Sequence, residues 1–158
     1  MVCRVAMPEA LSGACPADFN GRSAAVLDFD GNGLLDMLVT EDGAQGARLF
    51  RNKGGLRFED ATAAAGLPAA LHSNSVAAGD LDNDTRPDLL IVGKGGNRLF
   101  LNDGAGRFAE APGAAAVFAI QTRDGDDMPC GACLGDVDCD GRLDVVIGQH
   151  FDHPWRAP

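Results

Sequence analysis

Three short acidic windows hold the side chains of this sequence that are best suited to chemistry. They read "DFDGNGLLD" at 28–36, "DLDNDTRPD" at 80–88 and "DVDCDGRLD" at 136–144. Each window places side-chain oxygens at its positions 1, 3, 5 and 9. Carboxylates this close repel one another by roughly 1 kcal/mol in bulk water and by more at the lower dielectric constant of a protein surface. We therefore expect a bound cation among them.

Oxygen ligands at alternate positions suit a hard cation of the size of calcium, which takes six to eight oxygens at about 2.3 to 2.6 Å. A loop that adds the backbone carbonyl of position 7 to these side chains can wrap such an ion. The predicted ligands are Asp28, Asp30, Asn32, the Leu34 carbonyl and Asp36 in the first window, Asp80, Asp82, Asp84, the Arg86 carbonyl and Asp88 in the second, and Asp136, Asp138, Asp140, the Arg142 carbonyl and Asp144 in the third. The sequence thus predicts up to three Ca²⁺ ions as cofactors.

An EF-hand or a plain solvated turn would also produce a window of this kind. An EF-hand begins with the same pattern, but it needs a bidentate Glu at position 12 between two helices. Position 12 here is Val39, Ile91 or Ile147, and the flanking residues are typical of strands. Asp and Gly also occur in solvated turns without any ion, although three windows in register favour the cation.

The windows belong to a longer internal repeat. They begin at residues 28, 80 and 136, which gives repeat lengths of 52 and 56 residues. After the first two windows, "DMLVTEDGAQGARLFRNKGGLRFEDA" aligns with "DLLIVGKGGNRLFLNDGAGRFAEA", whereas the third copy continues only as "DVVIGQHFDHPWRAP". The third copy is therefore expected to be a half-repeat.

Each copy predicts a run of short strands. A small apolar stretch precedes each window and a continuous apolar stretch follows it, which suits a strand buried on both faces. Position 2 of each window (Phe29, Leu81 or Val137) is expected to point into the core. A third strand, "RLFRN" or "RLFLN", is followed by a Gly-rich turn and by a fourth strand that begins at Phe58 or Phe108.

Four short antiparallel strands in about 50 residues match the period of a propeller blade. The predicted fold is all-β, a partial β-propeller of about two and a half blades of four short antiparallel strands each. The predicted divisions are a poorly structured N-terminal extension (1–22), blade 1 (23–74), blade 2 with a longer link (75–130) and an incomplete blade 3 (131–158).

Composition limits the partners. The chain has 158 residues, of which 46% are hydrophobic, so a packed core is expected. With 23 Asp and Glu against 13 Lys and Arg, the net charge of -10 would repel nucleic acid and anionic membranes. The sequence contains no apolar run of the roughly 20 residues that span a bilayer, and its N-terminus lacks the apolar core of a signal peptide. We predict no nucleic-acid partner and no membrane insertion.

The remaining motifs do not predict catalysis. The sequence has 5 Cys, an odd number, and the C-x-x-C pair Cys130 and Cys133 is interpreted as structural. Whether Cys3 and Cys15 form a disulfide is left open. "GAGRFA" at 104–109 is expected in a turn between strands, outside the context of a dinucleotide site.

Three further segments are interpreted in the same way. His150 and His153 are assigned to an exposed tail. The sequon at Asn83 is attributed to chance, and "TRDGDD" at 122–127 is favoured as a solvated turn over a further cation loop. The chain is predicted not to be an enzyme.

The windows and their flanks resemble FG-GAP/VCBS repeats, the calcium-loop blades of integrin α-subunit head propellers. The phrases "LFRNKGGLRFEDATAAAGL" and "SVAAGDLDNDTRPDLLIVGKGGNRLFLNDGAGRF" are especially similar to the extracellular cartilage-acidic-protein and UnbV-type branch. The resemblance covers about residues 23–150. It implies a propeller, commonly of seven blades, with calcium in an outer hairpin loop of each such blade and a role in adhesion or scaffolding.

The sequence departs from that pattern at several points. Thr85 replaces the Gly33 and Gly141 of the other windows, which costs conformational energy if the position needs φ > 0. The neutral Asn32 leaves the first site one charge short, so weaker binding is expected there. Seven blades would need roughly 360 residues. The sequence therefore predicts a fragment, a truncated product or part of an assembly, whose open blade edges invite self-association.

The leading functional hypothesis is an extracellular or secreted calcium-binding propeller segment that presents a surface to a protein or glycan partner. Affinities of about 10⁻⁴ to 10⁻³ M are typical of extracellular calcium modules and would leave such sites empty in the cytosol. The alternative is an accessory propeller fragment of a larger enzyme. A third hypothesis, an intracellular calcium sensor, requires micromolar or tighter affinity.

Overall fold

The computed structural model describes residues 23–40, 46–69, 71, 73–93, 96–114 and 128–150. The predicted N-terminal extension, the "TRDGDD" segment and His153 lie outside these residues. The strands are β1 (Ala24–Leu27), β2 (Asp36–Thr40), β3 (Ala47–Asn52), β4 (Phe58–Asp60), β5 (Ser75–Gly79), β6 (Asp88–Val92), β7 (Arg98–Asn102), β8 (Phe108–Glu110), β9 (Met128–Gly135) and β10 (Asp144–His150).

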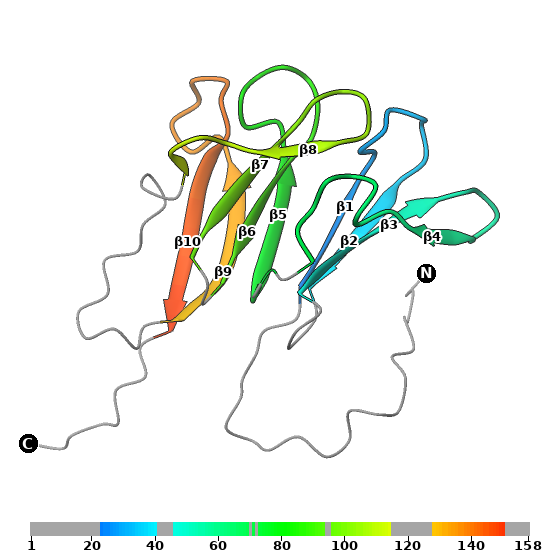
Figure 1. Ribbon diagram of the computed structural model, residues 1–158. Coiled ribbons are helices and arrows are strands. Elements are labelled where there is room, and N and C mark those ends of the chain that lie inside the picture. Colours follow the sequence, from blue (N-terminus) through cyan, green and yellow to red (C-terminus); the bar gives the residue numbers. More distant parts are fainter. Residues whose placement is uncertain are drawn as a thin grey trace, which may run out of the picture.

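These strands form three antiparallel sheets that do not close into a barrel or ring (Figure 1). Strands β1 to β4 form the first sheet in chain order, and β5 to β8 form the second in the same order. The third sheet contains β9 and β10. The predicted all-β fold of four-stranded blades followed by a half-repeat is confirmed. Among the described residues, no helix is long and hydrophobic enough to span a membrane.

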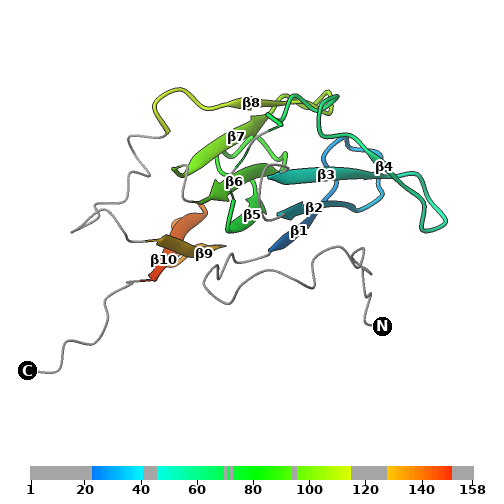
Figure 2. The same cartoon turned by 60° about the horizontal axis from the view of Figure 1, so that its bottom comes forward.

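The first strands of the three sheets lie next to one another. β1 contacts β5, and β5 contacts β9 (Figure 2). β4 and β8 lie on the side away from these first strands, and the three sheets together form an open arc. Each acidic window joins the first and second strands of its sheet. The acidic loop is thus in the first hairpin of each sheet, whose first strand contacts the neighbouring sheet, and calcium in this hairpin stays a prediction.

Strand register brings the two ends of each window together. The residue just before position 1 pairs with position 9 in all three hairpins, as Leu27 with Asp36, Gly79 with Asp88 and Gly135 with Asp144. Positions 1 and 9 therefore lie side by side at the end of a ladder. A one-residue slip would turn the carboxylate at position 9 to the other face of the sheet.

The core runs between the first two sheets. Phe29, at position 2 of the first window, is 1% exposed and stacks on Phe108 of β8, with ring centroids 6.1 Å apart. The prediction that position 2 points into the core is therefore confirmed for Phe29. It is wrong for Val137, which is 72% exposed because no described strand covers it. The exposure of Leu81 is intermediate between those of Phe29 and Val137.

Burial of the second strand of each sheet also depends on which sheets lie beside it. All five residues of β6 are buried, because its sheet lies between the other two. In β2, buried residues alternate with partly buried ones. Val146 of β10 is 51% exposed. Burial on both faces was thus predicted correctly for β6 and wrongly for β10, which lies at the end of the arc.

We expect Phe29→Ala to lower the free energy of unfolding by about 3 to 5 kcal/mol, because it leaves a cavity between the first two sheets. The matched control is Val137→Ala, at the same repeat position but exposed, which should change stability by less than about 0.5 kcal/mol. Urea unfolding in calcium-free buffer measures both. Equal losses in the two variants would contradict this description of the core.

Candidate metal centre

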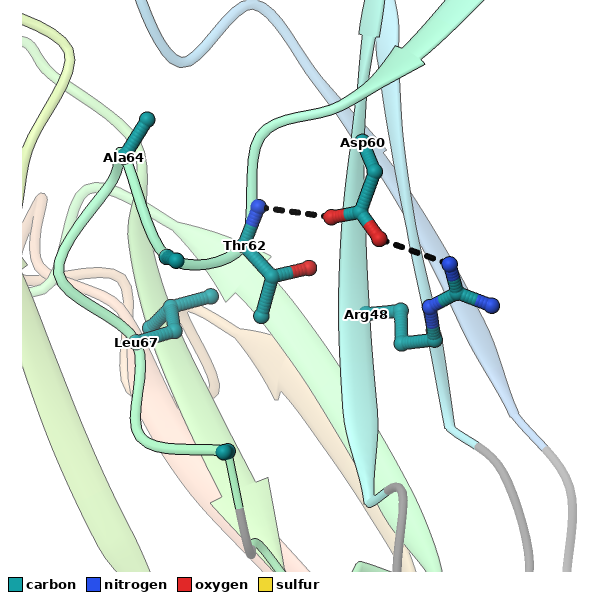
Figure 3. A pocket seen from close by; sticks show the side chains of 7 residues that line it. Arg48, Asp60, Thr62, Ala64 and Leu67 are labelled. Carbon is teal, nitrogen blue, oxygen red and sulfur yellow. Dashed lines mark hydrogen bonds and ion pairs between the residues drawn. The ribbon is translucent and has the colours of Figure 1, made fainter.

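The first candidate is an open pocket of about 620 Å³ beside β3 and β4 (Figure 3). Its charged groups pair with each other, since Arg48 Nη2 lies 2.6 Å from Asp60 Oδ2 and Asp60 Oδ1 accepts the N–H of Thr62. Alanines and Leu67 form the rest of its lining. The Arg48 guanidinium lowers the pKa of Asp60 to about 2. This pocket lacks the uncompensated charge of the acidic windows.

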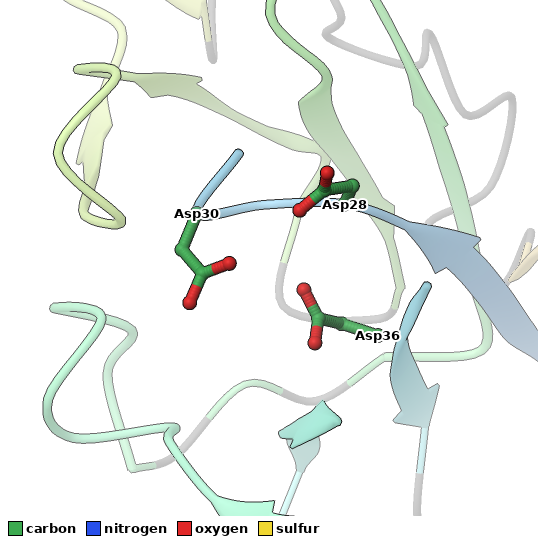
Figure 4. Close-up of side chains that lie close together, drawn as sticks. All are labelled: Asp28, Asp30 and Asp36. Carbon is green, nitrogen blue, oxygen red and sulfur yellow. The ribbon is translucent and has the colours of Figure 1, made fainter. Parts of the chain in front are cut away.

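The second candidate is repeated three times. In each window the carboxylates at positions 1, 3 and 9 form a group in which one oxygen atom from each lies within 4.8 Å of the other two. The members are Asp28, Asp30 and Asp36 in site 1, Asp80, Asp82 and Asp88 in site 2, and Asp136, Asp138 and Asp144 in site 3. The side chains of site 1 point into one common space (Figure 4). An upper limit of 4.8 Å is about twice a Ca–O bond length.

The first carboxylate of each site is held by the backbone of its own loop. In site 1, the N–H groups of Asn32 and Gly33 donate to the two oxygens of Asp28, at 3.0 and 2.8 Å. The same two bonds, from positions 5 and 6 to position 1, form at Asp80 and at Asp136. The loops thus have one geometry even where their sequences differ.

The carboxylate at position 9 connects the loop to the sheet. Asp36 is fully buried and accepts the N–H groups of Phe29 (3.1 Å) and Asn52 (2.7 Å), one on each oxygen. Asp88 is held in the same way by position 2 of its own window and by Asn102 of β7. Burial raises the pKa of both carboxyls, and the neighbouring carboxylates raise it further against the opposing effect of these N–H groups.

The carboxylate at position 3 of site 1 is in a different environment from those of the other sites. Asp30 forms an ion pair with Arg51 of β3, with Oδ2 2.8 Å from Nε. Its second oxygen, Oδ1, is buried and has no hydrogen-bond partner among the described residues. Asp82 and Asp138 are exposed instead and accept N–H groups from their own loops.

These donor sets fit a hard divalent cation. Each site has three convergent carboxylates, and site 1 also has a buried oxygen without a hydrogen-bond partner among the described residues, which such an ion would satisfy. The predicted ligands at positions 1, 3 and 9 are brought together in all three windows. Asp84 and Asp140, at position 5, are not members of the triads. The assignment of positions 5 and 7 as ligands stays a prediction.

At position 5, the described contact is a turn. Oδ1 of Asn32, Asp84 or Asp140 accepts the N–H of position 7 at 2.8 Å in each window. Asp84 also forms an ion pair with Arg86, whose Nε donates to the carbonyl of Asn102. These bonds close the loop, and they involve the one side-chain oxygen of Asn32, both oxygens of Asp84 and one oxygen of Asp140.

The loops need left-handed backbone at two positions. At position 6, φ is 82° for Gly33, 72° for Thr85 and 86° for Gly141. The expectation that Thr85 lies where glycine is preferred is correct. Position 4 is also left-handed, with φ of 63° at Asn83 and 62° at Cys139. The sequence reasoning missed this second position, which the glycine at position 4 of the first window could have revealed.

Two more of the predicted features fall within the described residues. Cys133 and Cys139 are free and exposed. "GAGRFA" includes the turn between β7 and β8, as predicted. Cys3 and Cys15 lie outside the described residues.

Comparison with known families identifies the repeat. Residues 28–91 and 80–147 each match the FG-GAP-like repeat, so the two matches together span most of the chain. The chain belongs to the FG-GAP-like repeat family. FG-GAP repeats build blades, and this chain is a β-propeller-like segment. A search of curated proteins found no match.

Thr85→Gly should stabilise the second FG-GAP repeat by about 1 kcal/mol, because a β-branched residue in left-handed backbone is strained by about 1 to 2 kcal/mol. The reciprocal variant, Gly141→Thr, introduces the same strain into the third repeat and should destabilise it by a similar amount. Urea unfolding of both variants measures the effect. A stability loss in Thr85→Gly would contradict the strain.

The pH dependence of calcium-free FG-GAP repeats should reflect Asp36 and Asp88. Their pKa is higher in the folded state, so their contribution to stability is complete below about pH 3.8 and is lost as pH rises through the folded pKa. Calcium favours the ionised carboxylates and should reduce this loss. We expect the Tm without calcium to fall from about pH 4 toward neutral pH, and to fall less with calcium.

Calorimetry of the calcium-free and calcium-loaded chain measures this dependence. Asp60→Asn is the control, because the lowered pKa of Asp60 gives stability that is present above about pH 3.8 and lost as pH falls toward 2. That variant should lower the Tm by a similar amount throughout the range above about pH 4, so it should leave the fall of the Tm toward neutral pH unchanged. A calcium-free Tm that rises steadily from about pH 4 to about pH 7 would contradict the prediction.

Proposed function

We propose that this chain is a calcium-binding FG-GAP segment that has no enzymatic activity. Its ions stiffen the first hairpin of each repeat, and the segment presents a surface to a protein or glycan partner. The observation that carries the proposal is the convergent carboxylate triad in each of three consecutive repeats. The buried Asp30 oxygen without a partner adds support, since a cation would satisfy it.

Charge gives a second reason for cation binding. The formal net charge is -10, and three divalent ions would bring it to about -4. Like charges about 4 Å apart repel by roughly 4 kcal/mol at an effective dielectric constant near 20. An ion between the carboxylates removes that repulsion, so binding should stabilise the folded chain.

We further propose an extracellular setting. At about 10⁻⁴ to 10⁻³ M affinity, millimolar calcium stabilises each site by roughly 0.4 to 1.4 kcal/mol, whereas submicromolar calcium has almost no effect. Exposed or half-exposed triads such as that of site 3 suit this weak range. The similarity to the cartilage-acidic-protein and UnbV-type branch supports the same assignment and a role in adhesion.

Calcium titration tests the proposal. Isothermal calorimetry should detect up to three ions, and the Tm should rise with calcium and fall with a chelator. Asp138→Ala removes one ligand of site 3 and should abolish about one binding event. Glu59→Ala is the control, because it removes the same charge from an exposed carboxylate outside the triads. Heat from no ion in the unaltered chain would overturn the proposal.

A further inference from the structure

The second blade contacts the first metal loop directly. The end of β7 brings Asn102, which is 3% exposed, to the backbone of Phe29. Asn102 Nδ2 donates to the Phe29 carbonyl at 3.0 Å, across 73 residues of sequence. Phe29 lies between Asp28 and Asp30, two members of the site 1 triad.

Both peptide groups around Phe29 are thereby fixed. Its N–H, in the peptide bond to Asp28, donates to Asp36 Oδ2 at 3.1 Å. Its carbonyl, in the peptide bond to Asp30, accepts from Asn102. The orientation of the chain that carries the position 1 and position 3 carboxylates therefore depends on a residue of the next blade.

Gly106, in the turn between β7 and β8, lies against Asp30. A Cβ on Gly106 would be 3.1 Å from Asp30 Cβ and 3.6 Å from the Phe29 ring, so the turn approaches the loop as closely as glycine allows. In sites 2 and 3, the carboxylates at position 3 are exposed. Within the described residues, this contact from a neighbouring blade is made to site 1 alone.

We propose that Asn102 and Gly106 are positioning residues of metal site 1, so that ion binding in the first blade is coupled to docking of the second. The inference rests on the proposed function and adds a regulatory contact to it. Because binding free energies are reciprocal, calcium in site 1 must tighten the contact between the blades by the factor by which that contact tightens calcium.

NMR titration with calcium reads the three sites separately. The backbone N–H groups of Gly33, Thr85 and Gly141 donate to the first carboxylate of sites 1, 2 and 3, so their amide shifts report each site. Gly106→Ala should weaken the affinity reported by Gly33 about three- to tenfold, the effect of losing one hydrogen bond or its geometry. The calcium affinity reported by the Gly141 amide should stay within twofold of that in the unaltered chain.

The control is Gly113→Ala. Gly113 has the same φ of 77° as Gly106, but a Cβ there would meet nothing within 4 Å. Gly113→Ala introduces the same backbone strain without the contact to Asp30, so the calcium affinity reported by the Gly33 amide should be unchanged. Equal affinities at Gly33 in Gly106→Ala and the unaltered chain would overturn the inference, as would equal weakening in both variants.

Asn102→Ala is the second variant, for use if Gly106→Ala does not fold. Its match is Asn52→Ala, since Asn52 makes the same bonds inside blade 1, to the Leu35 carbonyl and the Gly54 N–H. Asn102→Ala should weaken the calcium affinities reported by the Thr85 and Gly33 amides. Asn52→Ala should leave the affinities reported by the Thr85 and Gly141 amides unchanged. An effect of Asn102→Ala on Thr85 without one on Gly33 would overturn the inference.

The unaltered chain separates this inference from the proposed function. If the Gly33 amide shifts with calcium and the variants do not alter the affinity it reports, the coupling between site 1 and the second blade is wrong, whereas calcium binding is supported. If Gly33, Thr85 and Gly141 show no response at millimolar calcium, the proposed function is wrong and the coupling falls with it.

Discussion

The structure depends on the carboxylate at position 9 of each window. In Asp36 and Asp88 it is fully buried, beside two other carboxylates of its own site. Such a group is tolerated only because two backbone N–H groups donate to it, one from the loop and one from the third strand of the blade. The same bonds fix the loop to the sheet. A residual like-charge repulsion remains inside each site, and a cation is the natural group to relieve it.

Contacts between blades use the residues that flank these carboxylates. Phe29 follows the first ligand of site 1 and packs on Phe108 of the next blade. The end of the arc shows the importance of this packing, because Val137 at the same repeat position is 72% exposed and Asp144 is only partly buried. The loop that forms a site also supplies the apolar side chain that packs on the next blade. The candidate metal ligands of site 1 and the contact between the first two blades therefore share one short segment.

The sequence predicted what depends on local patterns. Alternating oxygens identified the three triads, and the repeat with its apolar stretches identified the strands, because both depend on residues close together in the chain. Exposure of Val137 and Val146 was not predicted, since burial depends on which sheet covers another. The bond from Asn102 to Phe29 was not predicted either. Asn102 belongs to a turn signal that is complete within its own blade, and nothing local reveals a partner 73 residues away.

The same ligand pattern is placed in three different environments. Site 1 is covered by the turn of the next blade, and its Asp30 is paired with Arg51. In site 2, Arg86 pairs with Asp84 and Thr85 strains the loop. Site 3 has no charged partner among the described residues and is open to water. Solvent screens the repulsion in site 3, whereas the buried oxygens of site 1 are screened less. The three candidate sites therefore share one pattern of carboxylates and differ in what covers each loop.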